Sequence, residues 1–370
     1  MPRRAAALAP RADRQHRPPL IAVTLGDPTG VGPEVALRAL ALAPASAAER
    51  IALLIGDLAV AEEARERLGL DMRIERVESP AAARELARAR DKQVIALLCP
   101  PAAAPLARTE RRPGRPNLAA AGAAFAAVAT AAGLALGGEV AAICTAPLAK
   151  EWLARAGLAR TGHTEILAGL ARAPRVRLMM VADELRVVLV TSHLALRDVA
   201  LALRPRNVLE TIAVTDAHLR KWWGIARPRI AVAALNPHAS DGGVYGDEEA
   251  RVIAPALRRA RAAGIRAEGP FPADALFSAM GPACDGVVAM YHDQGLIPIK
   301  QRDVHRAVNV TLGLPFVRTS PDHGTAFDIA GRRPADPRSM QHALELAVGL
   351  ARRVAGQQSR PAARARLSAR

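Results

Sequence analysis

Short apolar runs alternate with longer amphipathic segments along most of the chain. The runs stay apolar at consecutive positions, which is typical of strands that are covered on both faces of a sheet. We expect such strands at residues 20–26, 51–57, 93–99, 140–147, 186–193, 229–238 and 285–293. Segments with helical periodicity occupy residues 35–43, 60–70 and 82–90. Buried strands that alternate with helices predict an α/β fold.

The domain organisation follows from the length of the chain and from its lack of a linker. A chain of 370 residues can bury a large core and typically folds as two lobes. Neither an internal repeat nor a long low-complexity segment separates its halves. We therefore expect two interleaved α/β lobes.

Polar side chains close four of the expected strands. One run ends in a threonine before residue 147, and the next three end at His193, at an Asn-Pro-His sequence with His238, and at a Tyr-His-Asp sequence with His292. Ligands of open α/β sheets bind beyond the carboxyl ends of the strands. The four ends therefore predict a cluster of polar groups in one site.

The three histidines at these strand ends allow two interpretations. Neutral imidazoles that meet in space bind a divalent metal ion. Their spacings of 45 and 54 residues, however, match no local metal-binding motif. On the residues alone, three unrelated histidines that cap backbone groups are the simpler interpretation.

Two short motifs lie at the start of expected helices. Residues 26–34, GDPTGVGPE, match neither the dinucleotide-binding fingerprint nor the P-loop, and Pro33 suits a first helical turn. This motif fits a tight turn as well as it fits a ligand contact. Residues 162–165, GHTE, combine an imidazole, a hydroxyl and a carboxylate. They fit either a binding site or a capping box in which Thr164 or a neighbour caps the helix.

A further polar cluster accompanies residues 308–331. Lys300, Asn309 and Arg318 lie within nineteen residues of one another. A guanidinium, an ammonium and an amide are the groups that bind a phosphate or a carboxylate. Arginine is abundant in this chain and is usually solvated, whereas Lys300 is one of only four lysines. The cluster is a candidate anion-binding site.

The formal charge of +16 arises mostly at the two ends of the chain. Residues 1–19 hold five arginines and one aspartate, and residues 351–370 hold six arginines and no acid. Both ends are rich in alanine and arginine, which is typical of poorly ordered tails. Only 3% of the residues are aromatic, so the sequence offers no platform on which single-stranded bases could stack. We expect no nucleic-acid partner.

Composition also bears on the compartment. We expect no membrane span, because no stretch approaches roughly 18 uninterrupted apolar residues. The N-terminus lacks the apolar region of a secretory signal. Cys99, Cys144 and Cys284 are odd in number and far apart, which fits reduced, buried thiols better than disulfides. These features predict a cytoplasmic protein with no membrane partner.

Seven motifs, in order along residues 20–350, resemble the 4-hydroxythreonine-4-phosphate dehydrogenase family of pyridoxal phosphate biosynthesis. They are GDPTGVGPE, GHTEILA, TSHLALRDV, LNPHASDGG, GPFPADALF, AMYHDQGLIPIK and VNVTLGLPFVRTSPDHGTAFDIAG. The resemblance implies an isocitrate/isopropylmalate dehydrogenase-like fold, with two interleaved α/β domains flanking a cleft and a homodimer that completes the site. We accordingly expect disordered basic tails at 1–19 and 353–370, a first domain with the nucleotide-binding loop at 20–150 and 305–352, and a second at 151–304.

The resemblance also implies roles for individual residues. It places the metal ligands at His193, His238 and His292, and so reverses the simpler interpretation of these histidines. Substrate contacts fall on His163, Thr164, Lys300, Asn309 and Arg318. Acidic site positions fall on Asp274 and Asp293. The nucleotide is expected next to His323, Gly324, Thr325 and Ala326.

The reaction implied for the family is the NAD(P)-dependent oxidation of 4-phosphooxy-L-threonine. A divalent metal (zinc, magnesium or cobalt) assists, and decarboxylation gives 3-amino-2-oxopropyl phosphate. Ser240 and Asp241 stand where many members have Gly-Glu, and residues 302–309 also depart from the family pattern. These departures leave room for a dehydrogenase of 4-phospho-D-threonate or 4-phospho-D-erythronate. A non-redox, metal-dependent lyase or hydrolase is the remaining alternative.

Overall fold

A single mixed β-sheet forms the centre of the molecule. The computed structural model describes residues 18–42, 50–89, 93–159, 162–278, 281 and 283–367, so most of the expected N-terminal tail lies outside them. Within these residues, twelve strands join in the order β3-β4-β2-β1-β5-β12-β11-β6-β7-β10-β8-β9. The α/β class expected from the sequence is confirmed.

Seven of the strands are those that the apolar runs predicted. They are β1 (Leu20–Thr24), β2 (Ile51–Ile55), β4 (Val94–Leu98), β5 (Ala142–Thr145), β7 (Leu185–Leu189), β8 (Arg229–Ala233) and β10 (Gly286–Ala289). Five others were not expected, namely β3 (Arg73–Arg76), β6 (Arg177–Ala182), β9 (Arg266–Phe271), β11 (Val308–Leu312) and β12 (Val317–Pro321). β11 pairs antiparallel with both β12 and β6, and β6 pairs antiparallel with β7. The strand direction therefore reverses in the middle of the sheet.

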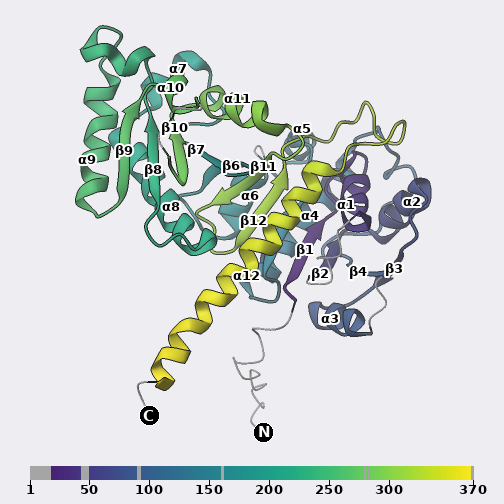
Figure 1. Cartoon of the computed structure of the whole chain (residues 1–370). Helices are drawn as coiled ribbons and strands as arrows, with labels where there is room; N and C mark the ends of the chain where they lie inside the picture. The colour runs from purple at the N-terminus through teal and green to yellow at the C-terminus, as the bar shows by residue number, and fades with distance from the viewer. Residues whose placement is uncertain are drawn as a thin grey trace.

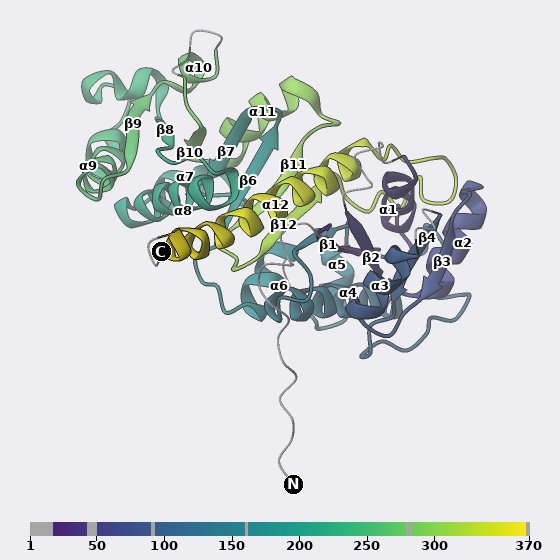
Figure 2. The same cartoon turned by 60° about the horizontal axis from the view of Figure 1, so that its bottom comes forward.

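Helices cover both faces of the sheet (Figures 1 and 2). Those named below are α1 (Gly32–Ala41), α4 (Leu118–Leu136), α5 (Lys150–Arg155), α6 (His163–Leu170), α8 (Pro205–Trp223), α10 (Ala273–Leu276), α11 (His292–Asp303) and α12 (Arg338–Leu367). The others are α2 (Leu58–Leu68), α3 (Pro80–Arg88), α7 (Leu196–Ala202) and α9 (Ala254–Ala262), with the short segments η3 (Pro237–Gly243) and η4 (Glu249–Ile253). Helix α12 packs on β5, β11 and β12, between α1 and α8. Figure 2 shows α4 on the opposite side of the strands from α12.

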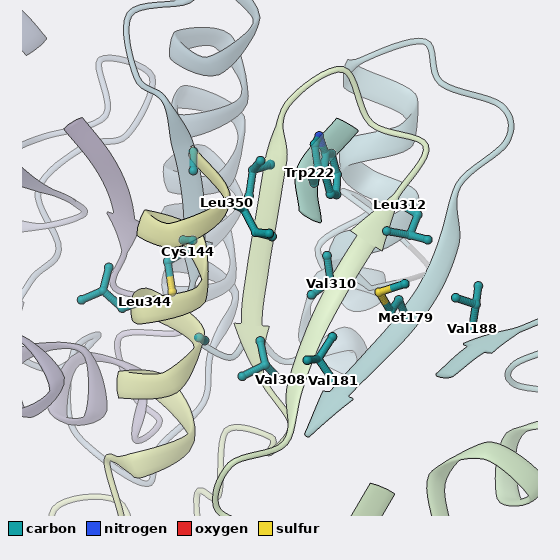
Figure 3. Close-up of a cluster of buried hydrophobic side chains, with 14 of the residues drawn as sticks. Cys144, Met179, Val181, Val188, Trp222, Val308, Val310, Leu312, Leu344 and Leu350 are labelled. Carbon is teal, nitrogen blue, oxygen red and sulfur yellow. The ribbon is translucent and has the colours of Figure 1, made fainter. Parts of the chain in front are cut away.

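Side-chain alternation on the central strands separates an apolar face from a polar one. Val308, Val310 and Leu312 of β11 belong to the core that α8 and α12 cover. Figure 3 shows them in a buried cluster with Trp222 of α8 and Leu350 of α12. Because successive strand residues point to opposite faces, the intervening polar residues of β11 point away from α12.

The final helix differs from the sequence expectation. A disordered tail was expected at residues 353–370, but α12 continues to Leu367. Alanine, arginine and glutamine favour helix, and the helix is held against α8 by two hydrogen bonds. Arg353 Nη1 donates to the carbonyl of Trp223 at 2.8 Å, and Gln357 Nε2 donates to the carbonyl of Arg220 at 3.2 Å.

The sequence expectation about apolar stretches also needs a correction. Helix α4 is 19 residues long and is apolar enough to cross a membrane by length and composition. Half of its most apolar window is buried in the structure. It packs on β1, β2 and β5 and on helices α5 and α6. An alanine-rich helix in the core of a protein also meets this criterion of length and composition, since alanine counts as apolar on a hydropathy scale.

Candidate functional site

A cavity of about 330 Å³ opens on the sheet face opposite α12. The helices that cover this face form two groups, with α4, α5 and α6 packed over one half of the sheet and α10 and α11 over the other. The cavity lies between α6 and α11, where neither group covers the strands. Its polar lining residues are Thr145, Lys150, His163, Thr164, Glu165, Arg177, Ser192, His193, His292, Asn309, Arg318, Ser320, Asp322 and His323.

The floor of the cavity holds a buried arginine. Arg318 of β12 is 1% exposed, and its guanidinium donates to Thr145 Oγ1 at 2.7 Å and to Thr311 Oγ1 at 3.0 Å. Asn309 Oδ1 lies 3.5 Å from Arg318 Nη1. Burial lowers the pKa of Arg318 to about 10, which still leaves it charged at neutral pH. Among the described residues, no carboxylate forms a salt bridge with it, so its charge is available to an anion.

The N-terminus of α6 forms one wall. Glu165 accepts a hydrogen bond from the backbone N–H of Gly162 at 3.1 Å, which is the capping contact that the GHTE motif predicted, made by the neighbour of Thr164. Burial, followed by the charges of Arg318 and Lys150, lowers the pKa of His163 well below 6.5. His163 Nε2 is buried and has no hydrogen-bond partner within the described chain. A neutral imidazole with a free nitrogen therefore faces a cationic cavity.

Two of the expected metal ligands face each other in the opposite wall. The ring centroids of His193 and His292 are 5.7 Å apart. These residues follow the parallel neighbours β7 and β10, whose carboxyl ends lie side by side. Asp293 Oδ1 lies 2.8 Å from His292 Nδ1, a contact that orients the ring and leaves its other nitrogen free. Burial, then the charges of Lys150 and His292, lowers the pKa of His193.

The third expected ligand lies elsewhere. His238 is exposed on η3, and its nearest aromatic neighbour is Tyr245, with 6.3 Å between the ring centroids. Across the described residues, no three His, Cys, Asp or Glu side chains are grouped closely enough to hold a metal ion. One copy of the chain thus brings two of the three histidines together, because His238 follows β8 on a loop that does not reach the cavity.

The remaining predicted substrate and nucleotide residues lie partly at the cavity. Lys300 is outside its lining, but Lys300 Nζ lies 3.3 Å from Asp322 Oδ2, and Asp322 is a lining residue. His323 and Gly324 also line the cavity, whereas Thr325 and Ala326 do not. The exposed Asp274, on α10, lies outside it as well.

The glycine-rich turn after β1 is buried and lies outside the cavity. The carbonyl of Thr325 accepts a hydrogen bond from the Val31 N–H at 2.9 Å. A Cβ atom at Gly30 would come within 2.8 Å of the same carbonyl oxygen. The structure therefore supports the tight-turn interpretation of residues 26–34, with glycine needed where the expected nucleotide loop packs against the turn.

Several cavity residues were missed by the sequence reasoning, among them the charged Lys150 and Asp322. Lys150 follows β5 at the start of α5, and Asp322 follows β12 directly. Lys150 packs over Gly162, where a Cβ atom would meet its Cε at 2.9 Å. The strand-end rule that selected the histidines also selects both residues. The signal for Asp322 is weak, because the residues of β12 form no apolar run.

The polar face of the sheet combines the buried guanidinium of Arg318 with the paired imidazoles of His193 and His292. This arrangement is typical of an α/β enzyme for a small anionic substrate. The sequence profile of the family described as "Pyridoxal phosphate biosynthetic protein PdxA" matches residues 48–347, and the chain belongs to this family. The family resemblance seen in the seven motifs is thereby confirmed.

Relatives of known name agree with this assignment. The 4-hydroxythreonine-4-phosphate dehydrogenase of Beijerinckia indica is 46% identical over 89% of this chain and 94% of its own length. The enzyme of the same name from Geobacter metallireducens is 45% identical over 90% of this chain and 96% of its own length. The crystal structure of the Klebsiella pneumoniae enzyme is 38% identical, with a TM-score of 0.79, over 90% of this chain and 99% of that one. The chain is therefore an oxidoreductase with a nicotinamide cofactor.

Proposed function

We propose that this protein oxidises 4-phosphooxy-L-threonine, the substrate named by its relatives, and that the product loses CO₂ to give 3-amino-2-oxopropyl phosphate. The observation that carries this proposal is the charge of Arg318, which is buried in the cavity floor without a carboxylate partner. A buried cation is costly unless an opposite charge joins it. The substrate supplies two such charges, a phosphate and a carboxylate.

The cationic and polar groups of the cavity bind and orient this substrate. Arg318 and Lys150 attract its anionic groups, and the Asn309 side chain adds an uncharged contact. At the N-terminus of α6, His163 and Thr164 lie where the helix end favours negative charge. Lys300 approaches from α11 and is held at the cavity by Asp322. Two anionic groups fixed at separate points orient the hydroxyl between them.

The paired imidazoles suit a divalent cation. His193 and His292 face one cavity, and Asp293 orients one of the rings, as second partners of metal-bound histidines do. A bound zinc, magnesium or cobalt ion supplies positive charge that favours the deprotonated form of the substrate hydroxyl. The two rings would hold such an ion, and His238 of a second copy is the third ligand that we propose.

Residues 323–326 would hold the nucleotide at this end of the cavity. NAD or NADP would supply the acceptor for the hydride of the carbon that bears the hydroxyl. His323 has a buried Nε2 with no hydrogen-bond partner among the described residues. This atom and the neighbouring backbone are available to the nucleotide. Asp274, which is exposed on α10 outside the cavity, stays a predicted site residue.

A homodimer would bring His238 to the paired imidazoles. The loop that carries His238 also exposes Val244 and Tyr245, at 71% and 51%. A second groove beside His193 and His292 is lined by the exposed Leu194 and Leu196. Two apolar surfaces, each next to part of one predicted metal site, are what a two-fold interface requires. We place this dimer in the cytoplasm.

A spectrophotometric screen tests the reaction. The purified protein is incubated with 4-phosphooxy-L-threonine, 4-phospho-D-threonate or 4-phospho-D-erythronate, with NAD or NADP and with each metal. We expect reduced nucleotide to form fastest with 4-phosphooxy-L-threonine. If a sugar-acid phosphate is turned over faster, that compound is the substrate instead. Loss of substrate without reduction of the nucleotide would contradict the redox proposal.

Mixing two inactive variants tests the shared metal site. His193→Ala and His238→Ala are each expected to be inactive. In their mixed dimer, one site combines both mutations and the other keeps all three histidines. Random mixing therefore restores about a quarter of the wild-type activity. No recovery in a mixture shown to contain mixed dimers would place all three ligands in one copy.

A further inference from the structure

The loop that carries His238 has an unusual backbone. Six consecutive residues have positive φ: 52° at His238, 54° at Ala239, 72° at Ser240, 44° at Asp241, 67° at Gly242 and 104° at Gly243. Four of them are not glycine. The left-handed conformation brings Cβ close to the following carbonyl oxygen, so each of these residues is strained. Such a turn persists only where its surroundings hold it.

The group that holds this turn is Glu249. The side chain is 4% exposed, and Glu249 Oε1 accepts the backbone N–H groups of Leu235 and Asn236, both at 2.8 Å. Glu249 Oε2 accepts from Asn236 Nδ2 at 2.9 Å and from the hydroxyl of Ser240. One carboxylate therefore binds the strand end that enters the turn and a residue at its centre.

The contact to Ser240 lies at the centre of this turn. Glycine adopts a positive φ without strain, whereas serine does not. In this chain the residue has a φ of 72° and its side chain is buried. The hydroxyl compensates for the lost conformational freedom, because it adds a donor to the buried carboxylate.

We propose that Glu249 is a positioning residue that fixes the left-handed turn and so presents His238 at the surface. The proposal that His238 is exposed in order to bind a metal rests on the proposed metal site, to which His238 of a second copy belongs. The role of Glu249 in holding the turn rests on the hydrogen bonds alone. Glu249 does not itself contact the substrate cavity.

Removal of one acceptor oxygen tests the proposal. In Glu249→Gln, an NH₂ group faces the donors of Asn236 and Ser240 in place of an acceptor. We expect zinc to bind the metal-free full-length variant at least tenfold more weakly in calorimetry, about 1.4 kcal/mol. Amide hydrogen exchange of residues 236–246 should become faster. The matched control is Asp247→Asn, which removes an exposed ion pair to Arg251 and should change neither.

A rescue separates positioning from general destabilisation. Ala239→Gly and Ser240→Gly, added to Glu249→Gln, relieve the strain at two positions of the turn and should recover part of the zinc affinity. Unchanged zinc affinity and exchange in Glu249→Gln, or no recovery in the rescued variant, would overturn the proposal.

The experiment also distinguishes this proposal from the proposed metal site. If wild-type protein bound no zinc, or if His238→Ala bound it normally, the metal site would be wrong. Exchange in residues 236–246 would still report whether Glu249 holds the turn. Slow exchange that persists in Glu249→Gln would contradict the holding role whatever the metal result.

Discussion

The guanidinium of Arg318 donates from Nη2 to Thr145 Oγ1 at 2.7 Å and from Nε to the same oxygen at 3.2 Å. The two residues lie on the parallel neighbours β12 and β5, on the face that forms the cavity floor. The hydroxyl satisfies donors without neutralising the charge. The contact therefore orients a cation and leaves it free to bind an anion.

Replacement of Arg318 should weaken substrate binding and leave the thermal stability of the fold nearly unchanged. In Arg318→Met, we expect kcat/KM to fall by about 10- to 100-fold for each charge-assisted hydrogen bond lost to the substrate. The thermal unfolding midpoint should change by at most about 4 °C, because a buried charge is removed together with its hydrogen bonds. Arg186→Met is the matched control, since Arg186 is a mostly buried arginine outside the cavity. Full activity in Arg318→Met would contradict the anion site.

The ammonium group of Lys150 should bind the substrate and should also lower the pKa of the His163 imidazole. In Lys150→Met, we expect the KM for the phosphorylated substrate to rise about tenfold, in keeping with one lost charged contact. The pKa of His163 should rise, because the charge of Lys150 is one of the causes that lower it. NMR titration of the histidine and steady-state kinetics measure the two effects. Lys221→Met, on α8, should alter neither, and a His163 pKa that does not move would place Lys150 away from this site.

Loss of one paired imidazole should release the metal. In His193→Ala, we expect bound zinc to fall from about one ion per chain to a small fraction, because a two-ligand site binds weakly. The loss of activity should exceed the ~1–3 kcal/mol of an ordinary hydrogen bond. Elemental analysis after dialysis measures the metal, and His305→Ala serves as a control on a histidine outside the cavity. A His193→Ala protein with full metal content and turnover would rule out this ligand.

Acid should destabilise the fold through two histidines. Burial is the main cause that lowers the pKa of both His163 and His218. His218 Nε2 accepts the N–H of Gly313 at 3.0 Å, and its ring packs edge-on against Trp222. As the pH falls below about 6.5, the unfolded state takes up protons first. Stability is therefore complete above that pH and is lost as the pH falls towards the lowered pKa values.

The slope of stability against pH gives the measurement. Each histidine contributes up to about 1.4 kcal/mol per pH unit within its window. Denaturant unfolding between pH 8 and 5 should show this loss, and His218→Gln should remove its share. An equal slope in wild type and variant would mean that His218 titrates alike in the folded and unfolded states.

Much of the fold could be predicted from the sequence, because buried parallel strands have a simple pattern. Four of the five missed strands lack that pattern for physical reasons, whereas β6 does contain an apolar run, at residues 178–182. In β11, Val308, Val310 and Leu312 face the core under α12, while Asn309 and Thr311 point to the opposite face of the sheet. The strand therefore alternates and does not form an apolar run. The same alternation is visible in the sequence, where it accompanies the predicted anion-binding residues.

The site could be predicted less completely, and the reason again lies in particular residues. Pairing of β7 with β10 brings His193 and His292 together, as the strand-end rule implies. The position of His238 depends on a left-handed turn of mostly non-glycine residues, which local sequence preferences do not predict. Its buried partner, Glu249, looks like one of several acids in a polar segment. The third ligand from a second copy stays a prediction.

The placement of β11 and β12 at the centre of the sheet has a consequence for synthesis on the ribosome. These strands come from residues 308–321, so the nascent chain makes both flanks of the sheet before the strands that join them. Until then, β5 and β6 each expose an unpaired edge, and such edges associate with other chains. Truncation before residue 308 should therefore yield an aggregating fragment. In the cell, the exposed edges of the two half-sheets must be protected until the last sixth of the chain has been synthesised.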